Sequence, residues 1–379
     1  MEKIRLGSYV EIDSGYAFKS ALFNENEGLP IIRIRDVTSG SVSTYYSGEY
    51  DEKYLVKNND LLISMDGSFI VRKWLGGNAL LNQRVCRIKS KDHNIILDDY
   101  IYRVLPKYLK NIEDKTSFVT VKHLSVKDIN EIEVYLPNLV VQKMIIDILD
   151  KAQSLIDKRK EQIEAYDELV KSLFYEMFGD PVKNDKGWKK DIIGNNFNVK
   201  TGSTPSRKEK HYWESGIIPW VKTTELKECV IIEAEEYITQ KAYENSSVTL
   251  FPEDTILIAM YGQGKTRGMT GKLAIKATSN QACAALLPNE KNNQDFIWNQ
   301  LKLSYDDLRN LGRGGNQPNL NLDLVRSFEI ILPPLSLQNK FAAQVEKIEQ
   351  QKQLLEQSLK ELENNFNSLM QRAFKGELF

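Results

Sequence analysis

The sequence predicts an α+β fold with two globular mixed α/β domains, each followed by a long helix. The two helices are expected to pack as an intramolecular antiparallel coiled coil with pseudo-two-fold symmetry. Two observations lead to this prediction. Apolar residues recur in alternating steps of four and three along residues 138–178, and again along 334–374. The second set follows the first at a constant offset, so the chain reads as a tandem repeat.

The repeat divides the chain into a first domain (1–137), a first long helix (138–178), a linker (179–187), a second domain (188–332) and a second long helix (333–379). Gly179 and Pro181 are typical of a helix end. Because the linker is short, the second domain must begin near the end of the first helix. The second helix can then bury its apolar stripe only by running back along the first, which predicts antiparallel pairing.

The predicted coiled-coil seam is formed by Ile145, Leu149, Ile156, Ile163, Tyr166, Val170, Phe341, Val345, Leu355, Leu359, Leu362 and Phe366. Arg159 and Lys352 are charged residues at seam positions. We interpret them as side chains whose apolar stems pack while their charged ends reach the surface. The alternative is that they fix the register of the pair, as polar seam residues can.

The two halves repeat the same order of shorter elements. In the first half, runs rich in β-branched residues predict strands at 30–37, 60–65, 84–88 and 131–136, and 98–109 reads as a helix. Ser125 and Asp128 form a capping-box pattern. The second half aligns with the first, so that Arg33 matches Lys222, Asp36 matches Glu225 and Asn82 matches Asn280. Framework positions match and loops differ, which favours one scaffold with two different binding surfaces.

Composition favours a soluble, cytoplasmic protein. The chain is 41% hydrophobic and 27% charged, without an apolar run long enough to span a membrane or act as a signal peptide. Its three cysteines form no CxxC pair, so neither a disulfide framework nor a zinc site is supported. The net charge of −1 argues against a strongly basic nucleic-acid binder. DNA binding would therefore rest on local basic loops, or on partner subunits that supply positive surface.

No catalytic or metal-binding pattern is present. The GQGKT segment at 262–266 lacks the first glycine of a P-loop, because Ala259 stands there. His93, His123 and His211 do not fall at metal-ligand spacings. Cys86 and Cys283 lie in apolar strand contexts, which is typical of buried structural thiols. We therefore expect a chain that is not an enzyme and holds no metal or cofactor.

Loops in both halves combine glycine with basic, amide and small polar side chains. Arg and Lys suit guanine edges and phosphates, while Asn and Gln suit adenine edges. Taken singly, each basic residue is more often a solvated surface charge. As a set they predict DNA contacts by Lys19, Ser20, Arg33, Arg35, Ser68, Arg72, Lys73, Thr204, Ser206, Arg207, Lys222, Thr223, Thr224, Tyr261, Gln263, Lys265, Arg267, Arg313, Asn316 and Gln317.

The chain resembles the specificity subunit of type I restriction–modification systems along nearly its whole length. The resemblance rests on LPxLxxQ at Leu136 and Leu332, GSTPSR at Gly202, IPW at Ile218 and the GxGK…NQxC pattern from Gly262. The first half departs from it, with GYAFKS in place of GSTPSR and DGSFIVRK in place of GQGKTRG. That difference fits two target-recognition domains for different DNA sequences.

The resemblance implies a non-catalytic subunit that reads a bipartite DNA site, one half per domain, with the helices setting the half-site spacing. Its implied partners are double-stranded DNA, two methyltransferase subunits and restriction/translocase subunits. S-adenosylmethionine, ATP and Mg²⁺ would bind those partners. Two alternatives stay open. One is the DNA-reading subunit of a related system with a fused methyltransferase–nuclease partner, and the other is a coiled-coil interaction scaffold without DNA readout.

Overall fold

The computed structural model describes residues 3–115, 122–312 and 319–378, and divides into two compact units. The first unit comprises 1–160 and 357–379, and the second comprises 161–356. Each long helix therefore contributes to both units, which are described separately below. The domain boundaries given from the sequence follow the ends of elements and stay predictions, as does the pseudo-two-fold relation between the halves.

In the residues of the first unit that the structure describes, three sheets form, with strand orders β1-β11, β2-β10-β7-β8 and β3-β5-β4-β9-β6. Its strands are β1 (Lys3–Arg5), β2 (Val10–Ser14), β3 (Phe23–Asn24), β4 (Leu29–Ile32), β5 (Tyr45–Tyr46), β6 (Leu55–Val56), β7 (Leu61–Ser64), β8 (Val71–Lys73), β9 (Ala79–Leu81), β10 (Val85–Ser90) and β11 (Glu133–Tyr135). Its helices are α1 (Ile34–Ser39), α2 (Asp98–Lys115), α3 (Val126–Asn130), the start of α4 (Leu139–Phe178), and the short 3₁₀ turns η1 (Leu6–Ser8), η2 (Ser20–Leu22) and η3 (Glu52–Tyr54).

The described part of the second unit also forms three sheets, with orders β12-β21, β13-β20-β17-β18-β15 and β16-β14-β19. Its strands are β12 (Lys190–Ile192), β13 (Val199–Thr201), β14 (Ile218–Val221), β15 (Cys229–Ile231), β16 (Glu236–Ile238), β17 (Ile256–Ala259), β18 (Thr270–Leu273), β19 (Thr278–Ser279), β20 (Cys283–Leu286) and β21 (Glu329–Ile331). Its helices are the end of α4, α5 (Ile193–Asn196), α6 (Gln240–Glu244), α7 (Gln294–Leu303), α8 (Tyr305–Asn310), α9 (Leu322–Ser327), the start of α10 (Leu335–Ala373), and the 3₁₀ turns η4 (Lys210–Tyr212) and η5 (Thr223–Glu225).

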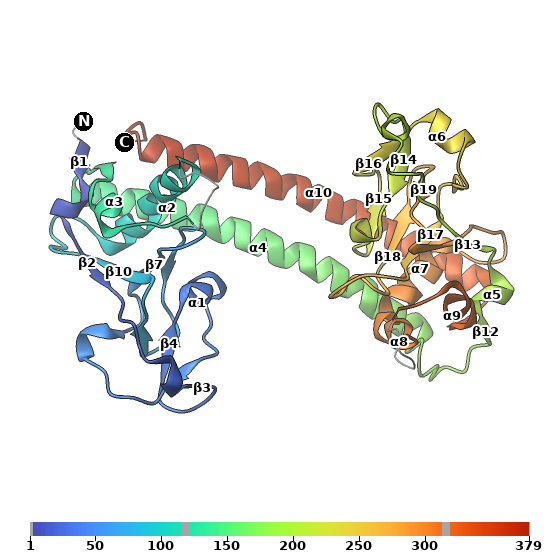
Figure 1. The fold of residues 1–379 in the computed structure, drawn as a ribbon, viewed down its shortest axis with the longest axis horizontal. Coiled ribbons are helices and arrows are strands. Elements are labelled where there is room, and N and C mark those ends of the chain that lie inside the picture. Colours follow the sequence, from blue (N-terminus) through green and yellow to red (C-terminus); the bar gives the residue numbers. More distant parts are fainter. Residues whose placement is uncertain (1–2, 116–121, 313–318, 379) are drawn as a thin grey trace. The chain divides into compact units, whose positions relative to one another are not determined.

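The two units share one strand plan. The order β2-β10-β7-β8 matches β13-β20-β17-β18, and the two-stranded pair β1-β11 matches β12-β21. In the third sheet β4 pairs in parallel with β9, as β14 does with β19. The unmatched strands are short edge strands: β3 and β6 in one unit and β15 in the other. The predicted α+β fold of two mixed domains with two long helices is therefore confirmed (Figure 1).

The long helices enter the cores of both units. In the first unit Ile145 and Leu149 of α4 and Ala373 of α10 lie in one buried cluster with Tyr100 of α2. In the second unit Phe174 of α4 packs with α7 and α10, and its ring lies 5.5 Å from that of Phe296. Early α4 thus meets late α10 in one unit, and late α4 meets early α10 in the other, as antiparallel helices require.

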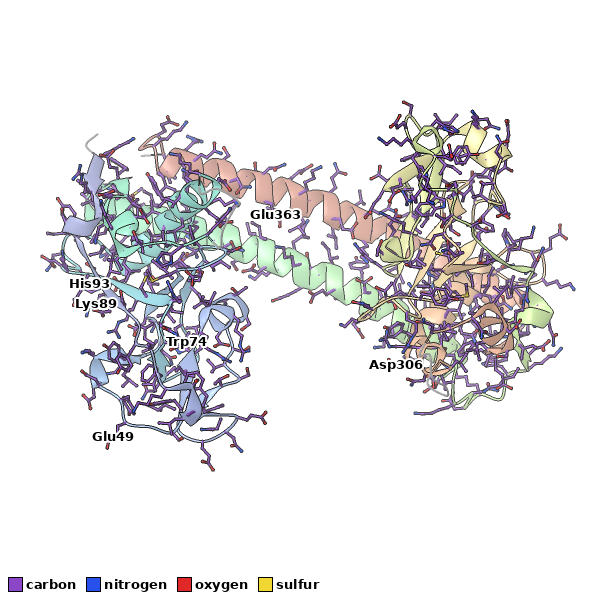
Figure 2. All side chains as sticks on the ribbon, in the orientation of Figure 1. Glu49, Trp74, Lys89, His93, Asp306 and Glu363 are labelled. Carbon is purple, nitrogen blue, oxygen red and sulfur yellow. The ribbon has the colours of Figure 1, made fainter. Side chains whose placement is uncertain are left out.

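All twelve predicted seam residues are buried or half-buried. Within the first unit, exposed Glu363 of α10, labelled in Figure 2, forms an ion pair with Lys160 of α4 at 3.1 Å. At the seam, the half-buried Lys352 donates to the carboxylate of Asp167. Surface pairs of this kind contribute little stability, about 0–1 kcal/mol each. The apolar seam therefore supplies most of the energy that pairs the helices.

One predicted strand is wrong in its second half. Strand β4 ends at Ile32, and residues of the predicted strand 30–37 continue as helix α1. The backbone N–H of Arg33 donates to the Asp36 carboxylate at 2.8 Å, which caps the first turn of the helix. In the second unit the backbone N–H of Lys222 donates to Glu225 at 2.7 Å in the same way. None of the helices in the described residues is long and apolar enough to cross a lipid bilayer.

Candidate nucleic-acid interface

In the second unit, the candidate loops meet at one short segment, residues 279–283, which we call the second anchor segment. Four backbone hydrogen bonds connect the loop roots to this segment. In each, the N–H of the first residue donates to the carbonyl of the second: Gly202 to Cys283 at 3.3 Å, Ser203 to Ser279 at 2.8 Å, Asn280 to Val221 at 3.1 Å and Met260 to Ala282 at 2.8 Å. Loops that lie far apart in sequence therefore leave the fold at the same place. This arrangement brings together, at one segment of the second unit, the roots of the predicted DNA-contacting loops that follow Gly202, Val221 and Met260.

The first unit has the same arrangement at residues 81–85, the first anchor segment. In the matched backbone hydrogen bonds, the N–H of the first residue again donates to the carbonyl of the second: Gly15 to Val85 at 2.9 Å, Tyr16 to Leu81 at 3.0 Å, Asn82 to Ile32 at 3.3 Å and Met65 to Arg84 at 2.9 Å. Each pair of residues corresponds to a pair in the second unit. The repeat therefore extends from sequence motifs to individual hydrogen bonds, and both halves present loops from equivalent roots.

Gly202 and Gly15 open the matched loops, and the nearby backbone leaves no room for a larger residue at either position. A Cβ atom on Gly202 would lie 2.2 Å from the Ser279 carbonyl oxygen. A Cβ on Gly15 would lie 2.0 Å from the Asn82 carbonyl oxygen. Both obstacles are backbone atoms of an anchor segment and cannot rotate away. Glycine therefore allows the loop and the anchor segment to approach closely.

A charged network lies beside the second anchor segment. Arg207 donates through Nη1 to the Glu236 carboxylate at 2.5 Å, and Lys222 pairs with both Glu235 at 2.8 Å and Glu236 at 3.0 Å. The hydrogen bond from Arg207 lowers the pKa of Glu236 against the opposing effect of burial. Hydrogen bonds from the two carboxylates raise the pKa of Lys222. Predicted residues Arg207 and Lys222 thus belong to one network.

The loop after β17 carries Tyr261, Gln263, Lys265 and Arg267. Tyr261, Gln263 and Lys265 are exposed, whereas the Arg267 side chain is buried and its Nε has no hydrogen-bond partner among the described residues. The loop is held from α8 by residues that the sequence did not single out. Tyr305 donates to the Lys265 carbonyl at 2.6 Å, and Arg309 donates to the carbonyls of Arg267, at 3.0 Å, and Gly264. Tyr305 and Arg309 could not be recognised from the sequence because they lie far from the loop along the chain, and no local motif marks an arginine that holds a distant loop.

Several predicted residues of the first unit have partners within the fold. The half-buried Arg33 donates to the Thr44 hydroxyl, and Arg35 donates to the same hydroxyl at 3.0 Å. Arg72 donates to the carbonyls of Val37 and Thr38 at the end of α1. A cation there opposes the negative end of the helix dipole. These contacts position α1 on its sheet.

The remaining predicted residues lie as follows. Lys73 donates to the Asp99 carboxylate at 2.7 Å, the Thr204 hydroxyl donates to the side-chain carbonyl of Gln281, and Thr223 and Thr224 lie in η5. Lys19, Ser68 and Ser206 are exposed on their loops, and Ser20 is exposed at the start of η2. Arg313, Asn316 and Gln317 lie outside the described residues. The contacts of all these residues with DNA stay predictions.

The cysteines and histidines considered for catalysis or metal binding are either buried or paired with a carboxylate. Burial raises the pKa of the Cys86 and Cys283 thiols to about 12, so neither is a thiolate near neutral pH. His93, His123 and His211 lie beside Asp98, Asp66 and Glu209. Across residues 3–115, 122–312 and 319–378, no group of three His, Cys, Asp or Glu side chains is placed to hold a metal ion.

Comparison with known proteins gives a family match along most of the chain. The family model described as "Type I restriction modification DNA specificity domain" matches residues 1–165 and 185–364. The type I restriction enzyme EcoBI specificity subunit of Escherichia coli is 42% identical over 170 residues, which cover 45% of this chain and 36% of that protein. The MjaIX specificity subunit of Methanocaldococcus jannaschii is 26% identical over 288 residues, covering 70% and 65%. The matches thus span less than two thirds of either relative.

Two solved structures share the fold. The crystal structure of the type I restriction–modification S subunit from M. genitalium superposes with a TM-score of 0.56 at 18% identity, covering 98% of this chain and 96% of that one. A chain from a structure of type I R-M complex assembly gives a TM-score of 0.54 at 15% identity, covering 100% and 98%. At these identities the likeness concerns the fold.

Proposed function

This chain belongs to the type I restriction modification DNA specificity family, and from that premise we propose that it is a non-catalytic subunit that reads a bipartite DNA target. Each globular domain reads one half of the target, and the paired helices α4 and α10 set the distance between the halves. The function places the chain in the cytoplasm with the DNA.

The observation that carries this proposal is the matched set of backbone hydrogen bonds at the two anchor segments. Residues 81–85 and 279–283 hold equivalent loop roots with equivalent backbone hydrogen bonds, while the loops themselves differ in sequence. A duplicated scaffold with divergent loops is what two readers of two different half-sites require. A single ligand site would not need the same loop arrangement twice.

The charge balance supports a reader that works with partners. The net charge is −1, and the Arg207 network places two carboxylates beside two cations. Strong binding to the phosphate backbone needs many uncompensated cations. We propose that two methyltransferase subunits dock along α4 and α10 and supply that positive surface, and that restriction/translocase subunits complete the complex. S-adenosylmethionine, ATP and Mg²⁺ would then serve these partners.

The proposal is tested by selecting from random duplex DNA with the full chain co-expressed with its methyltransferase partner. The expected result is a two-part motif whose halves are separated by a gap of fixed length and unspecified sequence. The control is the methyltransferase alone, which should enrich no such motif. Absence of enrichment in the complex, with both subunits folded and bound to each other, would overturn the proposal in favour of an interaction scaffold.

A further inference from the structure

Arg207 is held in place on three sides, which is unusual for a side chain that is half exposed. Its guanidinium lies 3.6 Å from the centre of the Trp213 ring and 4.8 Å from that of Trp220. The Glu236 carboxylate accepts its Nη1 hydrogen at 2.5 Å. An exposed arginine ordinarily samples many rotamers, and ordering it costs on the order of 1–2 kcal/mol. Here that cost is met during folding, before any ligand binds.

The groups that hold Arg207 are themselves fixed. The Trp220 indole donates to the Ser203 carbonyl at 2.9 Å, and the Trp213 indole donates to the Ser206 carbonyl at 3.2 Å. The two rings meet edge to face, with centroids 4.9 Å apart. Ser203 is bonded in turn to the second anchor segment. Arg207 is therefore attached to the edge from which the candidate loops emerge.

The orientation leaves most of the guanidinium free to recognise a ligand. One N–H of Nη1 is used by Glu236, and elsewhere in the part of the chain that the structure describes the guanidinium makes no further hydrogen bond. An arginine has five N–H donors in a planar fork. The remaining donors include a neighbouring pair, which is what a bidentate contact to two acceptors needs.

The surrounding charge indicates which acceptors these are. Arg207 and Lys222 face Glu235 and Glu236, so the cations of the network are balanced by carboxylates. A DNA phosphate brought to Arg207 would also be brought towards the Glu236 carboxylate, and like charges repel. A base edge carries no formal charge and meets no such repulsion. The network therefore favours a base over the phosphate backbone.

We propose that Arg207 reads a guanine in the major groove, within the half-site of the second domain, with Glu236 and the two tryptophans as positioning residues. Guanine is the base that offers two adjacent acceptors, O6 and N7, to an arginine fork. Trp213 and Glu236 keep the plane of the fork fixed, so that a wrong base leaves its donors unpaired. This inference rests on the proposed function and specifies one base of one half-site.

The experiment repeats the random-duplex selection with the full chain and its methyltransferase partner for three variants. Arg207→Lys keeps the charge and loses the fork. Glu236→Gln keeps a side chain of the same size and loses the charge that orients Arg207. Lys208→Gln is the matched control, because Lys208 is an exposed cation in the same loop. The base preference at each position is then confirmed by measuring the affinity for single-base variants of the selected duplex at several salt concentrations.

The expected result for Arg207→Lys is loss of one guanine preference in one half-site, by about tenfold, with the other half-site and the gap unchanged. Glu236→Gln should weaken the same preference, and Lys208→Gln should leave it intact. The unchanged half-site shows that the variant chain folds and assembles. Uniform weakening across sequences, with a shallower salt dependence, would show a phosphate contact and overturn the inference. An unaltered motif would overturn it equally.

Failure of this inference and failure of the proposed function are distinguishable in the same data. If the unmodified complex yields no two-part motif, the proposed function fails. If it yields the motif and Arg207→Lys changes none of its positions, the assignment of Arg207 fails while the proposed function stands.

Discussion

Gln142 and Gln338 share two equivalent hydrogen bonds at the starts of the two long helices. Gln142 donates to the Pro137 carbonyl at 2.9 Å and accepts the backbone N–H of Leu97 at 2.9 Å. Gln338 donates to the Pro333 carbonyl at 2.8 Å and accepts the N–H of Asn293 at 2.9 Å. Both side chains are buried. The repeated glutamine therefore fastens each helix to its own globular domain.

Replacing Gln338 by leucine should lower the free energy of unfolding of the second unit. The substitution leaves the buried carbonyl of Pro333 and the part-buried N–H of Asn293 without their partner, and an unpaired buried carbonyl alone costs about 1–3 kcal/mol. Urea unfolding of the full chain measures the effect, with the exposed Gln351→Leu as the matched control. Equal stability of the two variants would show that the glutamine bonds do not anchor the helix.

Gly202→Ala should destabilise the edge that carries the candidate loops. The new methyl group would meet two backbone oxygens, of Ser279 and Asn280, at 2.2 and 2.3 Å. Relieving such overpacking costs about 1–3 kcal/mol. The expected readout is a lower urea midpoint together with loss of one half-site motif. Loss of both half-sites, with the first unit still folded, would contradict independent readers.

These positions show where sequence reasoning succeeds and where it stops. The heptad stripe is a local, periodic signal, and the duplicated order of strands can be read by aligning the two halves of the sequence; both predict the fold well. The role of Gln338 is not local, because its partner Asn293 comes from another part of the chain. The strand predicted at 30–37 fails after Ile32 for a related reason. The run of β-branched residues predicts that Asp36 lies in a strand, whereas its carboxylate caps helix α1.

The candidate site shows the same division. Residue types marked the loops, and the structure brings their roots together. Sequence alone could not separate arginines that hold the fold from those free to meet a ligand. Arg72 turns out to donate to the end of α1, while Arg207 keeps most of its donors unpaired in the described structure. Arg309 carries no motif and was missed.

Arg309→Ala should release the loop of residues 261–268. Arg309 donates to the carbonyls of Arg267 and Gly264, and to the Tyr305 hydroxyl at 2.8 Å. Removing the guanidinium leaves the loop without these bonds. Hydrogen exchange should become faster in 261–268 and stay the same in β17. The exposed Lys291→Ala serves as the charge-matched control, and identical exchange in both variants would argue against this role.

Glu236 gives a prediction about pH. Its pKa is lowered from the ordinary 4.5, first by the hydrogen bond from Arg207. A carboxyl with a lowered pKa in the folded state adds stability above its unfolded pKa and loses it as pH falls through the folded value. The pair is partly exposed, so the effect should be about 0.2–1 kcal/mol.

Urea unfolding of the full chain and of Glu236→Gln measures this contribution. Near pH 7 the unmodified chain should be the more stable of the two. As the pH falls well below the ordinary carboxyl pKa of 4.5, the difference should vanish, because both side chains are then uncharged. A difference that persists in acid would indicate that packing, and not the ion pair, carries it.

The central claim is that two independent readers are separated by a helical spacer. The most direct test inserts one heptad into each long helix, between Lys160 and Glu161 and between Glu356 and Gln357, where the compact units divide both helices. These points lie opposite each other in the antiparallel pairing, so the seam stays in register. Seven residues lengthen a helix by about 10 Å, or roughly three base pairs.

The measurement is the random-duplex selection with the lengthened chain and its methyltransferase partner. Both half-site motifs should be unchanged, and the gap between them should grow by about three base pairs. A lengthened chain that selects the original gap, or one that alters either half-site, would contradict it.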